Sequence, residues 1–411
     1  MDFVVVGHHF WGSPGGGQLV CASVAKSFER LGFGPVLSGV FRFDSRRYVE
    51  WYGIDLTKYP TVTLPLGLRA FGLWGRLFVW LPLRHAIDRY KPFLVFLDEV
   101  TYRPILSRKA RYGFKLIEYI HFPFEVVYQP RFRGSGLHYG EDPYIMERYG
   151  KFPMNIYWRV FTWGLGRVAR DNPFHAADFV LVNSRWTANV AKIVYGEEPT
   201  VLNPPLPPNI DVVKEPRSFD VREPVIVMVG RFSEEKRYHW VVTELMPKLI
   251  KEVPGTRLVI FGGANTPTQR AYLGRVRALA EGSGLRVAVG LGSDADVFLV
   301  PNAPRRVINE VMDNARVFLH ATINEHWGIV VAEAMARALP PVVHRSGGAW
   351  TDLVEEGRYG LGYESVDEAV NALAKLLTDG RAWQSLASAI PGRVLELTLD
   401  KFTEKLGKYI R

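Results

Sequence analysis

Short apolar runs alternate with helical patterns along most of this chain, and this alternation constrains its fold more than any other feature. Strand, helix and strand in succession favour a parallel sheet that is covered by helices. The predicted strands are residues 3–7, 35–40, 93–97, 115–119, 179–182, 225–229, 257–261, 286–289, 317–319 and 342–344. The clearest helical patterns are residues 18–31, 155–170, 238–251 and 269–281. The sequence therefore predicts an α/β fold built from Rossmann-like, doubly wound units.

A proline-rich segment divides this pattern into two sets. Residues 201–208 contain four prolines, which disfavour sheet hydrogen bonds and stiffen the chain. We place the boundary at about residue 205, which predicts an N-terminal domain over 1–205 and a C-terminal domain over 206–390. Residues 391–411 contain a last predicted helix, at 394–410, that could pack back on the first domain.

The composition excludes several classes of protein. Cys21 is the single cysteine, so an internal disulfide and a cysteine-based zinc site are excluded. Residues 1–7 form a short apolar strand rather than the basic start of a secretory signal. The most apolar stretch, 64–83, is interrupted by Arg69 and Arg76 and is a poor membrane span. We therefore expect a cytoplasmic protein.

The charge of the chain predicts an anionic partner. The net charge is +9 and aromatic residues make up 13% of the sequence. A lipid surface, a nucleic acid and a phosphorylated substrate all fit this balance. Because no recognition helix or RNA-binding platform is evident, we expect no nucleic-acid partner.

A glycine-rich loop lies between the first predicted strand and the first predicted helix. Gly15, Gly16 and Gly17 allow a close approach that a side chain would block, and Gln18 follows them. The free N–H groups of the helix start suit a phosphate or an incoming hydroxyl. The loop matches neither the dinucleotide fingerprint nor the P-loop pattern, and a plain turn between strand and helix is the alternative interpretation.

A second loop holds two cations in the equivalent place of the second half. Gly230 turns the chain after the strand 225–229, and Arg231 and Lys236 flank the start of the next helix. Two cations beside a helix start can bind a diphosphate and stabilise the charge of a leaving group. The alternative is that Lys236 is a solvated helix residue.

The most specific segment is residues 324–336, which carry two glutamates. Glu325 lies in a loop before a helix and Glu333 lies about two turns inside it, among small apolar residues. A buried carboxylate needs a partner, which a ribose diol can supply. The N–H groups from His326 onward are placed to face phosphates. A structural salt bridge is the alternative for either glutamate.

Polar residues at strand ends add to this set, since open α/β sheets bind ligands at the carboxyl ends of their strands. His121 lies just after the predicted strand at 115–119. Residues 346–348 form a permissive Ser-Gly-Gly loop after the strand 342–344. A lone histidine is more often structural, so for His121 both roles stay open.

An aromatic and basic stretch at residues 66–84 suggests contact with a membrane surface. Trp74, Trp80, Arg69 and Arg76 lie in it, and such a composition suits the membrane interface. A buried helix is the alternative. Residues 128–133, which include Arg131 and Arg133, could serve the same surface or the acceptor.

These motifs together resemble the retaining glycosyltransferases of the GT4 family, which have the GT-B fold. Glu325 and Glu333 match the E-x7-E element of that family. Residues 14–17, 119–123, 182–187, 324–329 and 344–348 are most similar to the ALG11-type branch, which transfers α-1,2-linked mannose from GDP-mannose to a dolichol-diphosphate oligosaccharide. The resemblance runs from about residue 5 to 390.

The resemblance implies a donor site between two Rossmann-like domains and a role for each matching residue. Catalytic roles fall to His121, Arg231, Lys236 and Glu325. The donor-binding residues are Gly16, Gly17, Arg231, Lys236, Glu325, His326, Trp327, Gly328, Ile329 and Glu333. The acceptor or membrane residues are Gly15, Gln18, Arg69, Trp74, Arg76, Trp80, Arg131 and Arg133. The family implies retention of configuration without metal or other cofactor.

The expected partners are a nucleotide sugar, a lipid-linked oligosaccharide and the cytoplasmic face of a membrane, which the enzyme contacts peripherally. In place of the acidic residue that usually follows the glycines in this branch stands Gln18. Two other functions stay open: a UDP-sugar-dependent transferase that makes a glycolipid or a soluble glycoside, and a non-catalytic nucleotide-sugar or membrane-binding module.

Overall fold

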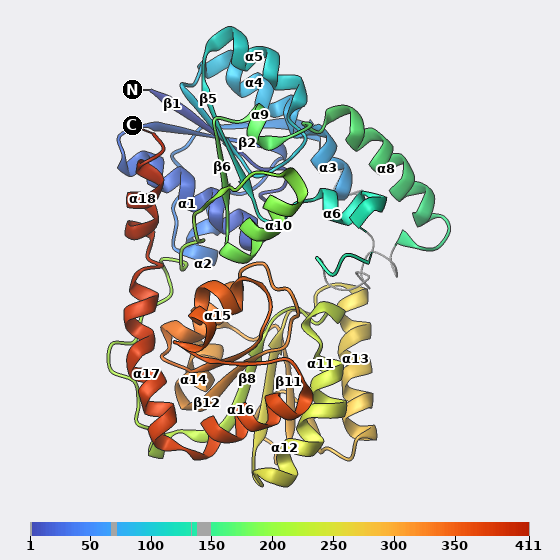
Figure 1. The fold of residues 1–411 in the computed structure, drawn as a ribbon, viewed down its shortest axis with the longest axis vertical. Coiled ribbons are helices and arrows are strands. Elements are labelled where there is room, and N and C mark those ends of the chain that lie inside the picture. Colours follow the sequence, from blue (N-terminus) through green and yellow to red (C-terminus); the bar gives the residue numbers. More distant parts are fainter. Residues whose placement is uncertain (1, 67–71, 133, 138–148, 411) are drawn as a thin grey trace. The chain divides into compact units, whose positions relative to one another are not determined.

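The computed structural model describes residues 2–66, 72–132, 134–137 and 149–410, and it divides into two compact units (Figure 1). Unit 1 comprises Met1–Ile210 and Leu397–Arg411, and unit 2 comprises Asp211–Glu396. Each unit is an α/β body with a parallel sheet. This division lies five residues after the boundary that we placed at 205.

The sheet of unit 1 has seven parallel strands within the described residues, in the order β3-β2-β1-β4-β5-β6-β7. The strands are β1 (Phe3–Gly7), β2 (Gly34–Phe41), β3 (Thr61–Leu66), β4 (Leu94–Leu97), β5 (Lys115–Ile120), β6 (Phe179–Val182) and β7 (Thr200–Val201). Val5 is paired with Val36 on one side and Val95 on the other, and all three are fully buried. Apolar strands buried on both faces are typical of parallel sheets.

Helices cover both faces of this sheet. They are α1 (Gly16–Arg30), α2 (Arg47–Tyr52), α3 (Gly72–Phe78), α4 (Trp80–Tyr90), α5 (Leu106–Tyr112), α6 (Glu125–Tyr128), α8 (Met154–Val168), α9 (Pro173–Ala176), α10 (Arg185–Tyr195) and α18 (Leu399–Gly407). The strands predicted at 3–7, 35–40, 93–97, 115–119 and 179–182 are confirmed. The sequence missed β3, which contains a proline, and β7, which is very short.

Unit 2 repeats this plan, with the strand order β10-β11-β9-β8-β12-β13-β14 in its described sheet. The strands are β8 (Glu223–Val229), β9 (Arg257–Gly262), β10 (Val287–Val289), β11 (Val297–Pro301), β12 (Ala315–His320), β13 (Pro341–His344) and β14 (Leu361–Tyr363). The helices are α11 (Tyr238–Trp240), α12 (Met246–Glu252), α13 (Pro267–Gly282), α14 (Arg305–Asn314), α15 (Ile329–Ala336), α16 (Val366–Thr378) and α17 (Gly380–Leu395). A π-turn at Val241–Leu245 joins α11 to α12, so the predicted helix at 238–251 is confirmed with a local irregularity.

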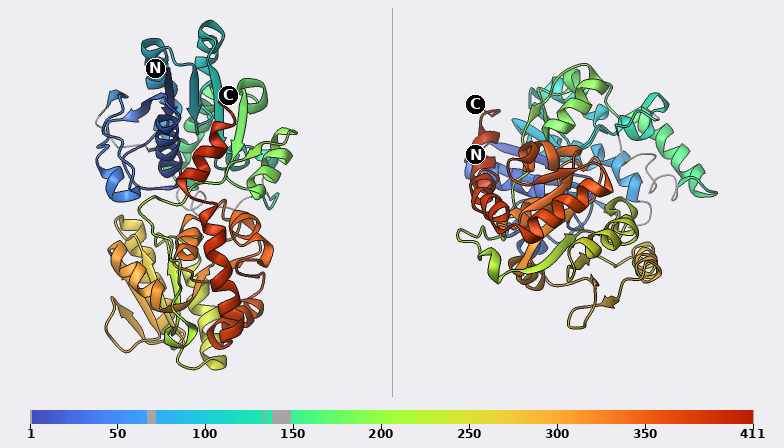
Figure 2. Two further views of the ribbon diagram at one scale, coloured as in Figure 1. Left: turned by 90° about the vertical axis from the view of Figure 1, so that its left-hand side faces the viewer. Right: turned by 60° about the horizontal axis from the view of Figure 1, so that its bottom comes forward.

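The single helix predicted at 394–410 is wrong. The first helix, α17, ends at Leu395, and a second helix, α18, begins at Leu399. The Thr398 side chain caps α18 by accepting a hydrogen bond from the Lys401 N–H. Helix α18 packs on α1, where the Ser27 and Thr403 hydroxyls lie 2.7 Å apart (Figure 2). The last residues of the chain therefore complete unit 1, while α17 belongs to unit 2.

The strand order reverses once in each sheet. In unit 1 this happens between β1 and β4, and in unit 2 between β8 and β12. The loops at the carboxyl ends of such strands diverge and leave room for a ligand. The glycine loop follows β1, and the segments that carry Lys236 and Glu325 follow β8 and β12. Both topologies place the predicted motifs where doubly wound sheets bind ligands.

The described part of the segment 66–84 is mostly buried. It forms α3 and the start of α4, in which Leu77, Val79 and Leu83 are covered by the rest of unit 1. Trp80 packs against the core beneath the sheet, and Trp74 stacks on Phe78. The structure favours the buried-helix alternative for these residues. Arg69 lies outside the described residues, as does Arg133.

Candidate functional site

Glu325 is the centre of a charged cluster at the switch point of unit 2. Its Oε2 atom lies 2.9 Å from the Lys236 Nζ and 3.0 Å from the His320 Nε2. His320 is the last residue of β12, while Lys236 ends the short turn Glu234–Lys236 after β8. The Lys236 ammonium also reaches the Thr322 hydroxyl, at 3.4 Å. The loops after the two strands thus bring the predicted Lys236 and Glu325 together.

The electrostatics of the cluster keep Glu325 ionised. Burial tends to raise the pKa of its carboxyl, but Lys236 and His320 hold that pKa well below the usual value. Burial lowers the pKa of His320, so this imidazole is neutral near pH 7 and its Nε2–H donates to Glu325. The side chains of Lys236 and Glu325 are each 16% exposed. Lys236 can therefore still meet an anion.

A glycine turn fixes the backbone that carries Glu325. The Gly348 N–H donates to the Glu325 carbonyl at 2.7 Å, and the Asn324 N–H donates to the Ser346 hydroxyl at 2.7 Å. Gly347 has a φ of +77°, and a Cβ atom there would lie 2.2 Å from the Glu325 carbonyl oxygen. The Ser-Gly-Gly loop after β13 is therefore a scaffold for the loop after β12.

His344, at the end of β13, is part of the same scaffold. Its Nδ1 lies 2.8 Å from the Ser346 hydroxyl. Burial, and then the positive charge of Arg237, lower the pKa of His344 to about 4. This imidazole is therefore neutral near pH 7.

Glu333 lies on α15 and is paired with an arginine of α14. The Arg305 Nη1 donates to the Glu333 Oε2 at 2.7 Å, and its Nη2 to Oε1 at 3.3 Å. Glu333 is buried, whereas the side chain of Arg305 is 44% exposed. The structural ion pair that the sequence left open for Glu333 is thus formed. Arg305 was not predicted as a site residue.

The remaining donor-site residues flank the cluster. Arg231 extends into solvent with a 69% exposed side chain and meets Glu235 at 3.3 Å. Gly328 has a φ of +95° and precedes α15, which begins at Ile329, so the helix start lies beside Glu325. Trp327 is buried, and His326 lies between Glu325 and Trp327 in the sequence.

The switch point of unit 1 holds a second charged cluster, centred on Asp98. Asp98 follows β4 and accepts hydrogen bonds from the His8 Nδ1, at 2.8 Å, and from the His121 Nε2, at 2.9 Å. Burial alone would lower the pKa of His8, but Asp98 raises it above the usual value. The cluster therefore pairs a carboxylate with an imidazolium and fixes which nitrogen of His121 carries a proton toward Asp98.

A second ionic group, formed by His9, Glu99 and Arg76, lies next to the Asp98 cluster. The His9 Nδ1 is 2.5 Å from a carboxylate oxygen of Glu99, and the Arg76 Nη1 is 3.5 Å from the other. Burial tends to raise the pKa of Glu99, while Arg76 and His9 lower it below its usual value. Arg76, predicted to face acceptor or membrane, thus points to Glu99 and also stacks on the Phe124 ring.

The glycine loop closes over the Asp98 cluster. A Cβ atom at Gly17 would lie 3.1 Å from the Asp98 Oδ2 and 3.4 Å from the His121 Nε2. A side chain at this position would therefore push into the cluster. The Gly15 N–H donates to the Tyr52 hydroxyl at 2.6 Å, and Gln18 donates to the Phe10 carbonyl at 2.7 Å. Gln18 thus holds the loop in shape, and Gly16 starts α1 beside it.

The C-terminal part of the chain matches a known protein family. Residues 209–391 match the family model described as group 1 glycosyl transferases. The matched region holds every residue of the Glu325 cluster and both members of the pair formed by Glu333 and Arg305.

Two relatives of this chain carry one name, GDP-Man:Man(3)GlcNAc(2)-PP-Dol alpha-1,2-mannosyltransferase. The human protein is 27% identical over 234 residues, which are 54% of this chain and 45% of that protein. The Dictyostelium discoideum protein is 23% identical over 398 residues, 90% of this chain and 71% of the relative. The chain thus spans about half the length of the human relative that it matches.

Solved structures support the same fold class. Anabaena HepE, in complex with UDP and glucose, superposes with a TM-score of 0.62 at 14% identity, over 100% of this chain and 99% of the other. The predicted fold class of two Rossmann-like units, the GT-B fold, is confirmed by this likeness and by the two parallel sheets.

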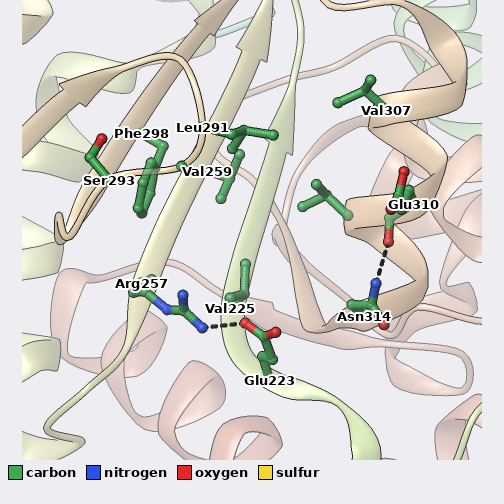
Figure 3. A pocket seen from close by; sticks show the side chains of 12 residues that line it. Glu223, Val225, Arg257, Val259, Leu291, Ser293, Phe298, Val307, Glu310 and Asn314 are labelled. Carbon is green, nitrogen blue, oxygen red and sulfur yellow. Dashed lines mark hydrogen bonds and ion pairs between the residues drawn. The ribbon is translucent and has the colours of Figure 1, made fainter.

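A pocket of unit 2 lies away from the Glu325 cluster. Its lining includes Val225, Val259 and Phe298, from the first halves of β8, β9 and β11, and the ion pair of Glu223 with Arg257 (Figure 3). These residues lie toward the amino ends of the strands, whereas Lys236 and Glu325 follow the carboxyl ends of β8 and β12. We therefore do not assign the donor to this pocket.

Possible metal ligands meet twice among the described residues of unit 1. One set is His8, Cys21 and Asp98, the other His8, His9 and Glu99, with ligand atoms within 4.8 Å of one another in each. Burial and the nearby Asp98 raise the pKa of the Cys21 thiol well above its usual value, so the thiolate that binds metals is disfavoured. The carboxylates of Asp98 and Glu99 already pair with imidazoles or with Arg76, and these partners offset their negative charge.

The clusters differ in how far the sequence predicted them. Lys236, Glu325 and His121 were predicted and each lies in a charged cluster. His8, His9, Asp98 and Glu99 were missed, although they are the first two residues after β1 and after β4 at the switch point. Arg131 is exposed and contacts Gln129 and the Phe132 ring, apart from either cluster.

Proposed function

We propose that this chain transfers mannose from GDP-mannose, with retention and in α-1,2 linkage, to an oligosaccharide carried on a lipid diphosphate. The observation that carries the proposal is the Glu325 cluster, a desolvated carboxylate held between Lys236 and His320 at the switch point of unit 2. It lies in the region that matches the group 1 glycosyltransferases, and two relatives are named for this reaction.

In the proposed reaction the cations of unit 2 stabilise the departing GDP. Lys236 is partly buried and fixed by Glu325, so its charge acts at low effective dielectric and needs little reorganisation. Arg231 is exposed and pairs only loosely with Glu235, so it can turn onto a diphosphate. Because these side chains supply positive charge, the proposal includes no metal or other cofactor.

Glu325 and Glu333 have separate roles in this proposal. Glu325 accepts hydrogen bonds from sugar hydroxyls, for which its ionised state is suited. Glu333 accepts from the ribose hydroxyls, and Arg305 releases it when the donor binds. The partly exposed Arg305 can make this exchange at a cost of only about 1 kcal/mol.

The proposal gives the acceptor to unit 1. Gly15, Gly16 and Gly17 leave the start of α1 open to a hydroxyl or a phosphate, and His121 faces the same loop. Asp98 orients the His121 imidazole through the 2.9 Å hydrogen bond, so His121 presents its other nitrogen to the sugar. Attack then occurs on the face from which GDP leaves, which retains the configuration.

The proposed location is the cytoplasmic face of a membrane, which the enzyme contacts peripherally. Among the helices of the described residues, none combines the length and the apolar run that crossing a bilayer requires. A lipid-linked acceptor requires the enzyme to work at a membrane surface all the same.

Calorimetric titration with GDP, UDP and ADP in EDTA tests the donor assignment. We expect selective binding of GDP by the wild type and strong loss of this binding in Glu333→Ala. Glu310→Ala, which removes an exposed glutamate of α14, is the matched control and should bind as the wild type does. A preference for UDP would contradict mannose transfer and favour a UDP-sugar transferase. Failure to bind any nucleotide would favour a non-catalytic module.

Transfer of labelled mannose from GDP-mannose to a lipid-diphosphate oligosaccharide tests the reaction itself. We expect product with GDP-mannose and none with UDP-glucose, with equal rates in EDTA and in magnesium. Loss of activity in EDTA would refute the metal-independent mechanism. An unchanged rate in Lys236→Met would refute the role of Lys236 in stabilising the leaving group.

A further inference from the structure

Helix α8 has apolar residues on two opposite faces, and one of these faces is exposed in the described part of the structure. On the inner face Phe161 and Leu165 are fully buried, and they form a small core with Leu77 of α3 and the partly buried Trp158. Figure 1 shows α8 beside α3 in unit 1. The inner face therefore accounts for the attachment of α8 to the rest of the unit.

The outer face of α8 exposes a continuous apolar stripe. Ile156, Val160 and Trp163 are 51%, 41% and 63% exposed, and Phe152, just before the helix, is 79% exposed. The spacing of four and three residues places Ile156, Val160 and Trp163 along one line of the helix, about 10 Å long. Four of the eleven exposed large apolar side chains among the described residues thus lie within 152–163.

Basic side chains flank this stripe. Arg159 and Arg167 are exposed on the same face, and Lys151 is exposed ahead of the helix. The Arg167 guanidinium lies 3.4 Å from the centre of the Trp163 ring. Residues 149–168 contain no acidic side chain. An apolar stripe with tryptophan at one end and arginines beside it is typical of a helix that lies in the interface of an anionic membrane.

We propose that this outer face of α8, defined by Phe152, Ile156, Val160 and Trp163, docks on the surface of an anionic lipid bilayer. The apolar side chains enter the boundary between headgroups and acyl chains, while Arg159 and Arg167 extend to lipid phosphates. A second copy of the chain is a poorer occupant, because a symmetric contact would bring the same basic side chains together. This proposal rests on the proposed function in one respect: a lipid-linked acceptor requires the enzyme to reach a membrane.

The proposal also replaces the segment 66–84 as the membrane contact. In its described part that segment has one large apolar side chain exposed, Phe78 at 38%, and its Arg76 is turned to Glu99. The membrane contact is thus assigned to a helix whose outer apolar residues are exposed in the described part of the structure.

Co-sedimentation of the full chain with vesicles tests the proposal. We expect binding to vesicles of phosphatidylcholine with one quarter phosphatidylglycerol, and much weaker binding to phosphatidylcholine alone. Ile156→Glu with Trp163→Glu should lower the partition constant by at least about tenfold. Arg159→Gln with Arg167→Gln should lower it about thirtyfold, since each cation near an anionic surface is worth about 1 kcal/mol. Ile193→Glu, at an equally exposed isoleucine of α10, is the control and should bind as the wild type does.

A fluorescent label locates the contact directly. Cys21, the single cysteine, is buried, so the thiol introduced by Trp163→Cys or by Ile193→Cys can be labelled selectively. An environment-sensitive dye attached after Trp163→Cys should shift to the blue with anionic vesicles, and the dye attached after Ile193→Cys should not. No shift at position 163, equal shifts at both positions, or no vesicle binding by the wild type would each overturn the proposal. A change of oligomeric state in the glutamate variants, without loss of vesicle binding, would also overturn it in favour of a second copy.

The proposal and the proposed function can fail separately. The vesicle assay contains no nucleotide sugar, so its outcome does not depend on the donor or on the reaction. Far-UV circular dichroism and the thermal unfolding midpoint of the glutamate variants show whether they are folded, and neither measurement uses a nucleotide.

Discussion

Replacement of Gly347 by alanine should displace the Glu325 backbone, although none of the side chains in the Glu325 cluster is changed. Gly347 has a φ of +77°, and its added Cβ would lie 2.2 Å from the oxygen and 2.6 Å from the nitrogen of Glu325. The left-handed backbone alone costs an alanine about 1–2 kcal/mol. Relief of the overlap requires the Glu325 backbone to move by about 1 Å, and a shift of this size in a catalytic constellation can cost about 10²-fold in rate.

The matched control is Gly284→Ala. Gly284 follows α13 with almost the same φ, +79°, but nothing lies within 4 Å of its added Cβ. This variant should lose only the backbone term of about 1–2 kcal/mol, measured by urea unfolding of each variant. Gly347→Ala should lose more stability and also most of the proposed mannosyl transfer. If both variants have the same stability and the same turnover, the Ser-Gly-Gly loop does not hold Glu325 in place and the reasoning is refuted.

Three further changes probe the two clusters. Asp98→Asn should lower turnover about 10²-fold while the GDP dissociation constant stays unchanged, because it disturbs the orientation of His121 and not the donor site; an unchanged turnover would exclude the positioning role. Arg305→Met should tighten GDP binding up to about fivefold in calorimetry, since Glu333 no longer has to leave an ion pair of about 1 kcal/mol; weaker binding would mean that Arg305 itself holds the nucleotide. The low pKa of His344 means that the unfolded chain takes up a proton first as the pH falls from about 6.5 to about 4, so the melting temperature should drop across this window. His344→Asn should flatten that drop, and an unaltered pH profile would show that His344 does not cause it.

The sequence predicted those parts of the fold that depend on local pattern. Apolar runs of four to six residues located the central strands of both sheets, and the rule that ligands meet strand ends located His121 and Lys236. The same rule applied to His8 and Asp98, which follow β1 and β4, and could have found the second cluster.

Other features depend on packing that no local pattern records. Arg305 and Glu333 are 28 residues apart, and their ion pair follows from how α14 and α15 lie beside β12. The segment 66–84 and α8 share aromatic, apolar and basic residues, so composition alone could not tell the buried helix from the exposed one. The exposed fractions of Leu77 and Trp163, 5% and 63%, make that distinction.

The return of the chain to unit 1 has a consequence for biosynthesis. Unit 2 is encoded without interruption by Asp211–Glu396, whereas unit 1 needs α18 from Leu397–Arg411 to cover Ser27 and its neighbours on α1. Domains usually fold in the order in which they leave the ribosome. Here the unit that begins first is finished last, so α1 stays uncovered while all of unit 2 is being translated. A nascent chain of this protein therefore exposes one side of its glycine-loop helix until the final residues of that unit have been made.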